Sequence, residues 1–563
     1  MLDFRNKKSV GNVIISTVVA VTLVMAPYTL ADPINLPKLS VLAFFSILAF
    51  SLIAPSVIGL FRSNYKSLAI VLSLFIIQIL LVFFFSGANL IGQFYGTYGR
   101  NTGVLTYLSL AFLLISTSLI SDKDFLKRFI RIALILGSLL IVYGNIQYLG
   151  LEPFPFNNLY NVNAPTGTFG NSNFQASFMG LIAVVASTMV LNSQFKILTR
   201  LGLGLMGLAA IGVVRETLSS QGYLNFIAGA GVVVMLWLFI SKRTSLAIAV
   251  AGLGVIGGGL VFLGLINSGP LAKYIYEASI AARGYYWRAA IKMLIEHPIF
   301  GVGMDNYGTW YARNRQVAME NGFSTNANSA HNVYLDLASN GGFPLILIYA
   351  ALLALVIASV VRVVKRSTGF DVYFAAIVGA WTAYQAQSFI SINQLGLAIW
   401  GWVLSGLIIG YEVNTRPKVT TNIPPVSRKR QSNKIKVSTQ QLSSSTTISL
   451  FIGVIVGAIV AIPPYYTNAT FFSALKSSDI KKMQSAAYLT PLDERRLLLM
   501  ATILRDNKYE AEAIAMARDA TARYPDSFDL WNLWAAIPTA SPSDVIQAKG
   551  QMKRLDPFNP NLK

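Results

Sequence analysis

Long apolar runs separated by short polar loops dominate the first 463 residues of the chain. A helix that crosses the hydrocarbon core of a bilayer needs ~20 mostly apolar residues. About thirteen runs approach or exceed this length, so the pattern predicts an all-α fold: a polytopic transmembrane helical bundle of about 12–13 spans. The runs lie near residues 11–30, 36–61, 67–87, 103–120, 129–149, 174–192, 197–214, 222–240, 245–266, 343–361, 373–391, 395–412 and 447–463.

The composition agrees with a membrane protein. Hydrophobic residues make up 54% of the 563 positions and charged residues only 12%, whereas a soluble chain is about a quarter charged. The chain has no cysteine, which excludes disulfides and thiolate metal sites. The first apolar run follows Arg5, Lys7 and Lys8 and is long for the apolar part of a signal peptide, so we expect a retained anchor.

The net charge of +21 is spread over short basic clusters between the apolar runs. This distribution is typical of membrane orientation, and we expect no nucleic-acid partner. Because cytoplasmic loops carry the excess of Lys and Arg, the clusters predict a multi-pass protein of the cytoplasmic membrane with its N-terminus inside. They alternate along the chain as Arg62 and Lys66; Lys123, Lys127 and Arg128; Lys196 and Arg200; Lys242 and Arg243; Arg362, Lys365 and Arg366.

This orientation divides the chain into four parts. Residues 1–412 form a polytopic membrane domain with a long outward loop at 267–342. Residues 413–446 are rich in Pro, Ser, Thr and basic side chains, which predicts a flexible cytoplasmic linker near anionic lipid. A final span at 447–463 then carries residues 464–563 to the extracytoplasmic side.

The last part of the chain changes to the pattern of soluble helical hairpins. We expect its first helix to be capped by Thr490, with Pro491 as the first helical residue. Small residues at Ala513, Ala517 and Ala520 predict the packed face of a second helix, which the corner "YPDS" ends. The pattern resembles tetratricopeptide-type hairpins of ~34 residues, and a generic α-hairpin domain fits it equally well.

The loops predicted to face outward carry the candidate functional groups. Within the longest loop, "ARGYYWRAAIKMLIEHP" predicts a helix that stops at Pro298. Its predicted apolar face consists of Arg283, Trp287, Ala290, Ile291 and Leu294. Arg288 falls on the charged face. An inward arginine is suited to bidentate binding of phosphate, whereas a snorkelling Arg283 and a solvated Arg288 are the plain alternatives. Shorter outward loops hold Arg100 and Arg215.

His331 is one of only two histidines in the chain. We expect it in the first turn of a helix capped by Asn328 or Ser329 and ended by Gly341–Gly342. The positive end of a helix dipole disfavours imidazolium, and a neutral histidine can accept a proton from an attacking hydroxyl. A structural, hydrogen-bonded histidine is the alternative. The second histidine, in "EHP", fits a cation near a helix C-terminus.

These motifs together resemble the O-antigen ligase and polymerase superfamily. The residues that carry the resemblance are "RGYYWRAAIKMLIEHPIFGVGMDNYG", "SAHNVYLDLASNGGFPLIL", "GTFGNSNFQASF" and "YGTYGRNTGVLTYL", and it covers most of 90–410. The family often has Ser-Arg-Gly before the helix that begins after the short outward loop near 215–222, where this chain has Gln221 in place of the arginine. Arg215, six residues earlier, is the candidate substitute.

The resemblance implies a metal-independent, lipid-diphosphate-dependent glycosyltransferase without a cofactor. Such a protein moves a glycan from an undecaprenyl diphosphate carrier to an acceptor hydroxyl on the outer face of the membrane. It implies His331 and Arg283 as catalytic residues, and Arg283, Arg215, Arg100 and Arg288 as ligands of the donor diphosphate. Its partners would be the polyprenyl-diphosphate-linked glycan, a glycan, lipid or protein acceptor, membrane lipid, and a protein bound through the C-terminal helices.

Several alternatives remain open at this stage. Within the enzyme class, an O-antigen or exopolysaccharide polymerase and a protein O-oligosaccharyltransferase fit the same residues as a ligase. A polysaccharide flippase or transporter is also polytopic, but such proteins usually carry charges within their spans, and these spans have few. A scaffold without activity leaves Arg283 and His331 unexplained.

Overall fold

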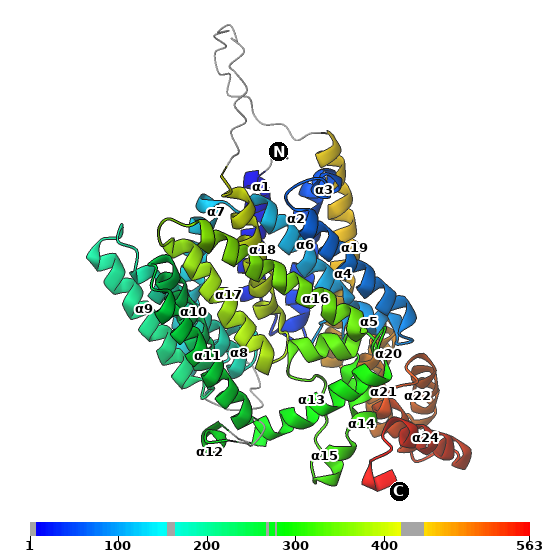
Figure 1. The fold of residues 1–563 in the computed structure, drawn as a ribbon. Coiled ribbons are helices and arrows are strands. Elements are labelled where there is room, and N and C mark those ends of the chain that lie inside the picture. The colour runs from blue at the N-terminus through cyan, green and yellow to red at the C-terminus, as the bar shows by residue number, and fades with distance from the viewer. Residues whose placement is uncertain (1–6, 155–163, 266–268, 276–277, 418–443, 563) are drawn as a thin grey trace.

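The structure is a computed structural model that describes residues 7–154, 164–265, 269–275, 278–417 and 444–562, and these residues form helices and loops without a β-strand (Figure 1). Thirteen helices coincide with the thirteen apolar runs, which confirms the predicted polytopic bundle. The bundle comprises α1 (Lys7–Leu23), α2 (Asn35–Ile53), α4 (Lys66–Phe85), α6 (Val104–Ile120), α7 (Lys123–Tyr148), α8 (Ser172–Val190), α9 (Ile197–Glu216), α10 (Gln221–Ile240), α11 (Thr244–Leu265), α16 (Val333–Arg366), α17 (Val372–Ile390), α18 (Leu395–Asn414) and α19 (Ser444–Ser477).

Ten helices of the described chain are long and apolar enough to cross a membrane. Of the other three in the bundle, α1 and α6 have 17 residues each, and α17 lies outside the ten although it is long enough. All three pack inside the bundle against longer helices. The helices outside the bundle are α3 (Val57–Leu60), α5 (Leu90–Tyr95), α12 (Ala272–Ile275), α13 (Ala278–Glu296), α14 (Tyr307–Asn314), α15 (Gln316–Glu320), α20 (Ile480–Ala487), α21 (Glu494–Asp506), α22 (Glu510–Arg523), α23 (Phe528–Ala535) and α24 (Pro542–Leu555), with 3-10 turns η1 (Ala54–Ser56), η2 (Gly167–Phe169) and η3 (Pro560–Leu562).

Helix α18 is the centre of the bundle. Every residue from Leu395 to Glu412 is buried, and the helix packs against α6, α16 and α17. A helix that is apolar on all sides is expected in such a position. By contrast, α11 lies at the periphery with most of its side chains exposed, as a span that faces lipid would. The hydrophobic sequence therefore serves packing in one helix and the bilayer in the other.

The two ends of the bundle carry different parts of the chain (Figure 1). At one end, Lys7 pairs with Asp122, and Arg366 Nη1 lies 2.8 Å from Glu412 Oε1. At the other end lie α13, α14 and the C-terminal helices, and we call this end the tail side. The ends of the helices therefore divide between two faces of the bundle, as loops that alternate between the two sides of a membrane require.

The tail, residues 478–562, is a series of helices in which each packs against the next. Ala513, Ala517 and Ala520 are fully buried, as their spacing predicts. The predicted start of the first hairpin is wrong, because α21 begins at Glu494 and Asp493 is its N-cap. The Asp493 carboxylate accepts hydrogen bonds from two backbone N–H groups of the first turn, and this satisfies more donors than a threonine three residues earlier could reach.

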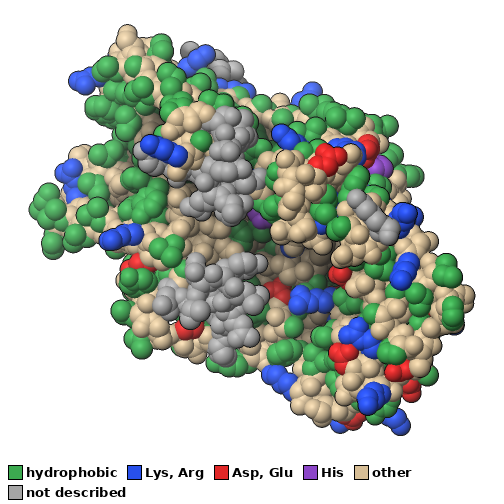
Figure 2. All heavy atoms as spheres, turned by 90° about the horizontal axis from the view of Figure 1, so that it is seen from below, with side chains coloured by type: hydrophobic (Ala, Val, Ile, Leu, Met, Phe, Trp, Pro, Cys, Tyr) green, Lys and Arg blue, Asp and Glu red, His purple; other side chains and the backbone are tan. Residues whose placement is uncertain are grey.

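The tail is docked on the long loop between α11 and α16. Arg315 Nη2 lies 2.6 Å from Asp556 Oδ2, and only 5% of either side chain is exposed. Arg313 Nη2 lies 2.7 Å from Asp526 Oδ1. Figure 2 shows the tail side, where charged side chains of both signs are interspersed over the region of the tail and hydrophobic side chains gather over the region of α9–α11. Two ion pairs thus fix the tail helices against the loop between α11 and α16.

Candidate functional site

Helix α13 supplies one wall of the site, and its packed face differs from the predicted one. The buried residues are Ala282, Tyr286, Ala289, Ala290 and Met293, which contact α14 and α16. The predicted apolar face included Ile291, which is 46% exposed. The tyrosines of α14 explain why the packed face of α13 is turned relative to the predicted one. They give Tyr286 a large packing surface, which the periodicity of α13 alone could not indicate.

Arg283 and Trp287 lie at the edge of this packed face, and both are part-buried. The Trp287 ring stacks on Phe262 with centroids 6.1 Å apart and meets Phe389 edge-on at 5.8 Å. Arg283 is close enough to Tyr286 to lower the pKa of its phenol, although burial, the larger effect, raises that pKa. The guanidinium therefore lies beside an aromatic cluster on the tail side of the bundle.

His331 does not lie in the first turn of a helix, which corrects the prediction. The helix begins at Val333, and its N-cap is Asn332, whose side-chain oxygen accepts from Leu335 N at 3.0 Å. His331 has φ = 52°, a left-handed conformation in which histidine is found more often than most residues. The residue is thus presented by a sharp turn before the helix. The predicted break at Gly342 is confirmed, since this residue has φ = 74° within α16.

The turn fixes the protonation of the imidazole ring. Nδ1 of His331 lies 3.2 Å from the carbonyl oxygen of Ser329, and a carbonyl can only accept, so Nδ1 carries the hydrogen. Burial, followed by the charges of Arg100 and Arg283, lowers the pKa of His331 to about 4, although the bond to Ser329 raises it. At neutral pH the ring is therefore uncharged, and Nε2 has a lone pair that can accept a proton.

Three hydrogen bonds hold the segment on both sides of His331. Arg100 Nη1 donates to Asn328 Oδ1 at 2.8 Å, and Ala330 N donates to the Asp336 carboxylate at 2.7 Å. Asn332 Nδ2 donates to the carbonyl of Phe389 at 2.9 Å. The ring itself lies 5.3 Å from that of Tyr286 on α13, measured between centroids. The histidine is therefore held between the first outward-loop arginine and helix α13.

Asp305 is a part of this site that the sequence did not single out. Its carboxylate accepts from Thr97 N at 2.8 Å and from Thr102 N and Oγ1 at 3.0 and 2.8 Å, and Arg100 Nε lies 3.7 Å away. Burial raises the pKa of this carboxyl, whereas Arg100 and the hydrogen bonds lower it. The signal available in the sequence was an aspartate within the glycine-rich stretch "GVGMDN". In the structure this stretch turns sharply, and Gly303 and Asp305 both have positive φ.

The predicted arginines divide into two groups. Arg100 and Arg283 lie close enough to His331 to lower its pKa, although Arg100 is only 7% exposed. Arg215, at the end of α9, and Arg288, on the outer side of α13, are exposed, and no contact within the described residues connects them to the His331 turn. Gln221 is buried and accepts from Ser177 at 3.4 Å, so this position packs helices together.

The second histidine has a different environment. His297 follows the last residue of α13, its backbone N–H bonds to Met293 O at 2.8 Å, and its ring meets Trp310 edge-on at 4.5 Å. Within the described residues, no group of three His, Cys, Asp or Glu side chains could hold a metal ion. The candidate functional groups near the turn are His331, Arg100, Arg283 and Asp305.

The fold and the site define a polytopic membrane protein with a histidine and two arginines gathered on one side. Residues 205–350, which include Arg283 and His331, match the family model described as O-Antigen ligase. The resemblance to the O-antigen ligase superfamily is thereby confirmed, and the chain carries an O-antigen ligase-like region of the kind found in membrane glycosyltransferases. No curated protein matches the chain.

Proposed function

We propose that this protein transfers a glycan from an undecaprenyl diphosphate carrier to an acceptor hydroxyl, as an O-antigen ligase-type glycosyltransferase. The observation that carries the proposal is the contact between His331 Nδ1 and the Ser329 carbonyl, which leaves Nε2 as a proton acceptor. The family match over the same region supports the reaction class. Arg283, beside the histidine, supplies a positive charge for a diphosphate.

The reaction forms one bond and breaks one. The acceptor oxygen attacks the anomeric carbon of the donor glycan while Nε2 of His331 takes the hydroxyl proton. The bond between that carbon and the phosphate oxygen breaks, and the lipid diphosphate leaves with the electron pair. Cations held in place lower the energy of this step because negative charge develops on the leaving group. This chemistry proceeds without a metal ion or cofactor in our proposal.

The arginines have separate roles in this proposal. Arg283 is part-buried beside His331 and is the main diphosphate ligand. Arg215 and Arg288 are exposed, so they would meet the diphosphate as it approaches. Arg100 is bonded to Asn328 and faces Asp305, so it would act on the donor mainly through its charge and through the position of the histidine turn.

The proposed reaction takes place on the extracytoplasmic side of the cytoplasmic membrane. The basic clusters at the opposite end of the bundle support this orientation, since positive loops stay in the cytoplasm. The glycan would therefore be joined to its acceptor after the donor lipid has been turned outward. The tail is docked on the same side, which supports a role for it in receiving the acceptor.

A reconstitution experiment separates transferase from transporter. Purified protein in liposomes receives a glycan linked to undecaprenyl diphosphate and a panel of acceptors: lipid-linked core sugars, growing polymer, wall glycan and protein. The proposal predicts that the glycan becomes covalently attached to at least one acceptor and that free undecaprenyl diphosphate is released. Movement of the intact donor between leaflets without any transfer would instead identify a flippase.

A further inference from the structure

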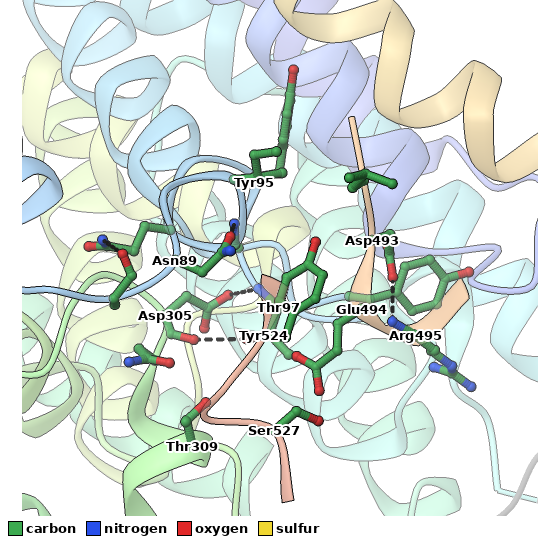
Figure 3. Close-up of a pocket in the computed structure, with 18 of the residues that line it drawn as sticks. Asn89, Tyr95, Thr97, Asp305, Thr309, Asp493, Glu494, Arg495, Tyr524 and Ser527 are labelled. Carbon is green, nitrogen blue, oxygen red and sulfur yellow. Dashed lines mark hydrogen bonds between the residues drawn. The ribbon is translucent and has the colours of Figure 1, made fainter. Parts of the chain in front are cut away.

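A hollow opens on the tail side, between the membrane domain and the tail (Figure 3). Its volume of about 620 Å³ lies within the range of about 300–1,000 Å³ of small-molecule sites. One wall comes from residues 87–101 and 304–309, and the other from residues 491–498 and 522–529. His331 and Arg283 are not among the residues that line it. We call this hollow the tail groove.

The charge of the tail groove excludes the donor diphosphate as its natural ligand. Two of the lining residues are basic, Arg495 and Arg523, whereas five are acidic: Asp305, Asp493, Glu494, Asp526 and Asp529. A diphosphate is negatively charged and would need more basic than acidic side chains around it. A polyprenyl chain would need a continuous apolar wall, whereas carboxylates, amides and hydroxyls interrupt the apolar side chains that line this groove. The ligand that fits is therefore neutral or positively charged and rich in hydrogen-bonding groups.

The arrangement of side chains favours a saccharide. Asn89 and Thr309 line the groove on the membrane-domain side, and Glu494 and Ser527 face them from the tail (Figure 3). Amides, hydroxyls and carboxylates match the donors and acceptors around a sugar ring. Tyr95, which is part-buried, also lines the membrane-domain wall, and an aromatic ring offers a flat apolar surface for the C–H face of a sugar.

Direct contacts keep the two walls together. The Arg495 guanidinium lies 4.9 Å from the centroid of the Tyr98 ring, and Asn89 Nδ2 donates to the Arg523 carbonyl at 3.3 Å. With the Arg313–Asp526 pair, these contacts join the tail to the membrane domain around the groove. A ligand would thus meet a preformed site, which lowers the entropic cost of binding.

The inner wall of the tail groove is shared with the histidine site. Asp305 lines the groove, Arg100 Nε lies 3.7 Å from its carboxylate, and Arg100 Nη1 bonds Asn328, three residues before His331. Arg100, Asp305 and Asn328 also line one small cavity. The tail groove and the histidine turn are therefore linked through one buried ion pair, Arg100–Asp305.

We propose that the tail groove binds the saccharide chain of the acceptor beside the histidine site. The identification of this saccharide as the acceptor rests on the proposed glycan transfer, whereas the recognition of a sugar does not. The saccharide can be a free oligosaccharide or the same glycan on a lipid anchor, since the lining groups would contact only the sugar.

The test measures oligosaccharide binding to the full-length protein in lipid nanodiscs. The probes are maltotetraose, mannotetraose and chitotetraose, with a neutral tetrapeptide as the non-sugar control. The variants are Glu494→Gln with Thr309→Val together, Glu512→Gln on an exposed part of α22 outside the groove, and His331→Ala. The proposal predicts that at least one sugar binds, and that the double variant weakens its affinity about 10-fold or more through loss of a charge-assisted hydrogen bond.

Glu512→Gln and His331→Ala should bind the sugar as the unmodified protein does. Binding of the peptide in preference to every sugar, absence of sugar binding, or equal affinity in the double variant would each overturn the proposal. Comparison of the bound sugar with the same sugar on a lipid anchor then tells the sources apart: equal affinities indicate recognition of the sugar alone, and tighter binding of the anchored form indicates a lipid-borne acceptor.

Kinetics of transfer separate this proposal from the proposed function. If both hold, the double variant raises KM for the acceptor while kcat stays near that of the unmodified protein. Unchanged KM and kcat in the double variant would overturn the groove and leave the transferase in place. Sugar binding that depends on Glu494 and Thr309, without transfer from any lipid diphosphate donor, would overturn the transferase and leave the groove.

Discussion

Arg100 donates a hydrogen bond from Nη1 to Oδ1 of Asn328 at 2.8 Å, across more than two hundred residues of sequence. The arginine is only 7% exposed and also faces Asp305. This contact joins the loop after α5 to the turn that presents His331, and the charge of Arg100 helps to lower the pKa of the imidazole. One buried residue therefore influences both the position and the basicity of the candidate base.

The unmodified protein should keep its transfer activity well below neutral pH. The pKa of His331 is lowered to about 4, so the ring remains an uncharged base above that pH and loses its lone pair only as the pH falls through it. We expect the acid side of the kcat/KM profile to fall near pH 4. A fall centred near the ordinary histidine pKa of about 6.5 would show that the imidazole is not desolvated in this way.

Replacement of Arg100 should move that acid limb. Arg100→Gln removes a positive charge that lowers the pKa of His331, so the histidine becomes easier to protonate and the limb shifts upward from about 4 toward about 6.5. The rate–pH profile of Arg128→Gln, a change at an exposed position of α7, is the matched control and should not move. A lower rate with an unshifted profile would leave Arg100 only a structural role.

Arg283 should affect the donor more than the acceptor. Arg283→Ala removes a charge-assisted contact worth about 1.5–3 kcal/mol, so donor affinity, turnover or both should fall roughly 10- to 100-fold. Arg283→Lys should restore only part, because a point charge replaces a planar fork. We would measure donor binding and steady-state transfer for each variant and check that it inserts into the membrane. Full activity of the alanine variant would remove Arg283 from the diphosphate site.

The buried pair Arg315–Asp556 should hold the tail in place. Arg315→Met leaves the Asp556 carboxylate buried without its partner, at a cost of about 3–5 kcal/mol. The tail should then become sensitive to limited proteolysis, and Arg315→Met with Asp556→Leu should recover much of the resistance.

The exposed pair Arg518–Asp544 provides the control for that experiment, because Arg518 is 62% exposed and such pairs contribute only about 0–1 kcal/mol. Arg518→Met should leave the protease resistance nearly unchanged. Equal losses of protease resistance in Arg518→Met and Arg315→Met would show that the buried pair does not hold the tail in place.

Much of the bundle could be predicted from the sequence because its signal is local. Length and apolarity define a span without knowledge of its neighbours, and all thirteen runs correspond to helices. The break at Gly342 was also predictable, since glycine tolerates its positive φ. The family motif likewise placed Arg283 and His331 in one region.

The site was less predictable where distant contacts decide the outcome. The N-cap of α16 is Asn332, and the pattern alone could not choose it over Asn328, which Arg100 engages from another loop. The packed face of α13 depends on Tyr307 and Tyr311, far along the chain. The tail groove requires the docking of two domains, and no single segment carries that information.

The orientation of the chain can be tested because it has no cysteine. Single cysteines at Ser324, Ser543 and Ser438 can be labelled in intact cells with a thiol reagent that does not cross membranes. Ser324 and Ser543 are exposed on the tail side, and Ser438 belongs to the segment predicted to be cytoplasmic. We expect labelling at the first two positions only. Labelling at Ser438 alone would reverse the proposed topology.

The transfer rate of His331→Ala tests the central claim most directly. Loss of a general base typically costs about 10²–10⁴ in rate, so the variant should lose that much turnover while donor affinity stays near normal, and added imidazole should restore part of the rate. His297→Ala, a change of the other histidine, is the control and should transfer at nearly the unmodified rate. A His331→Ala protein that transfers glycan as fast as the unmodified protein would contradict the account.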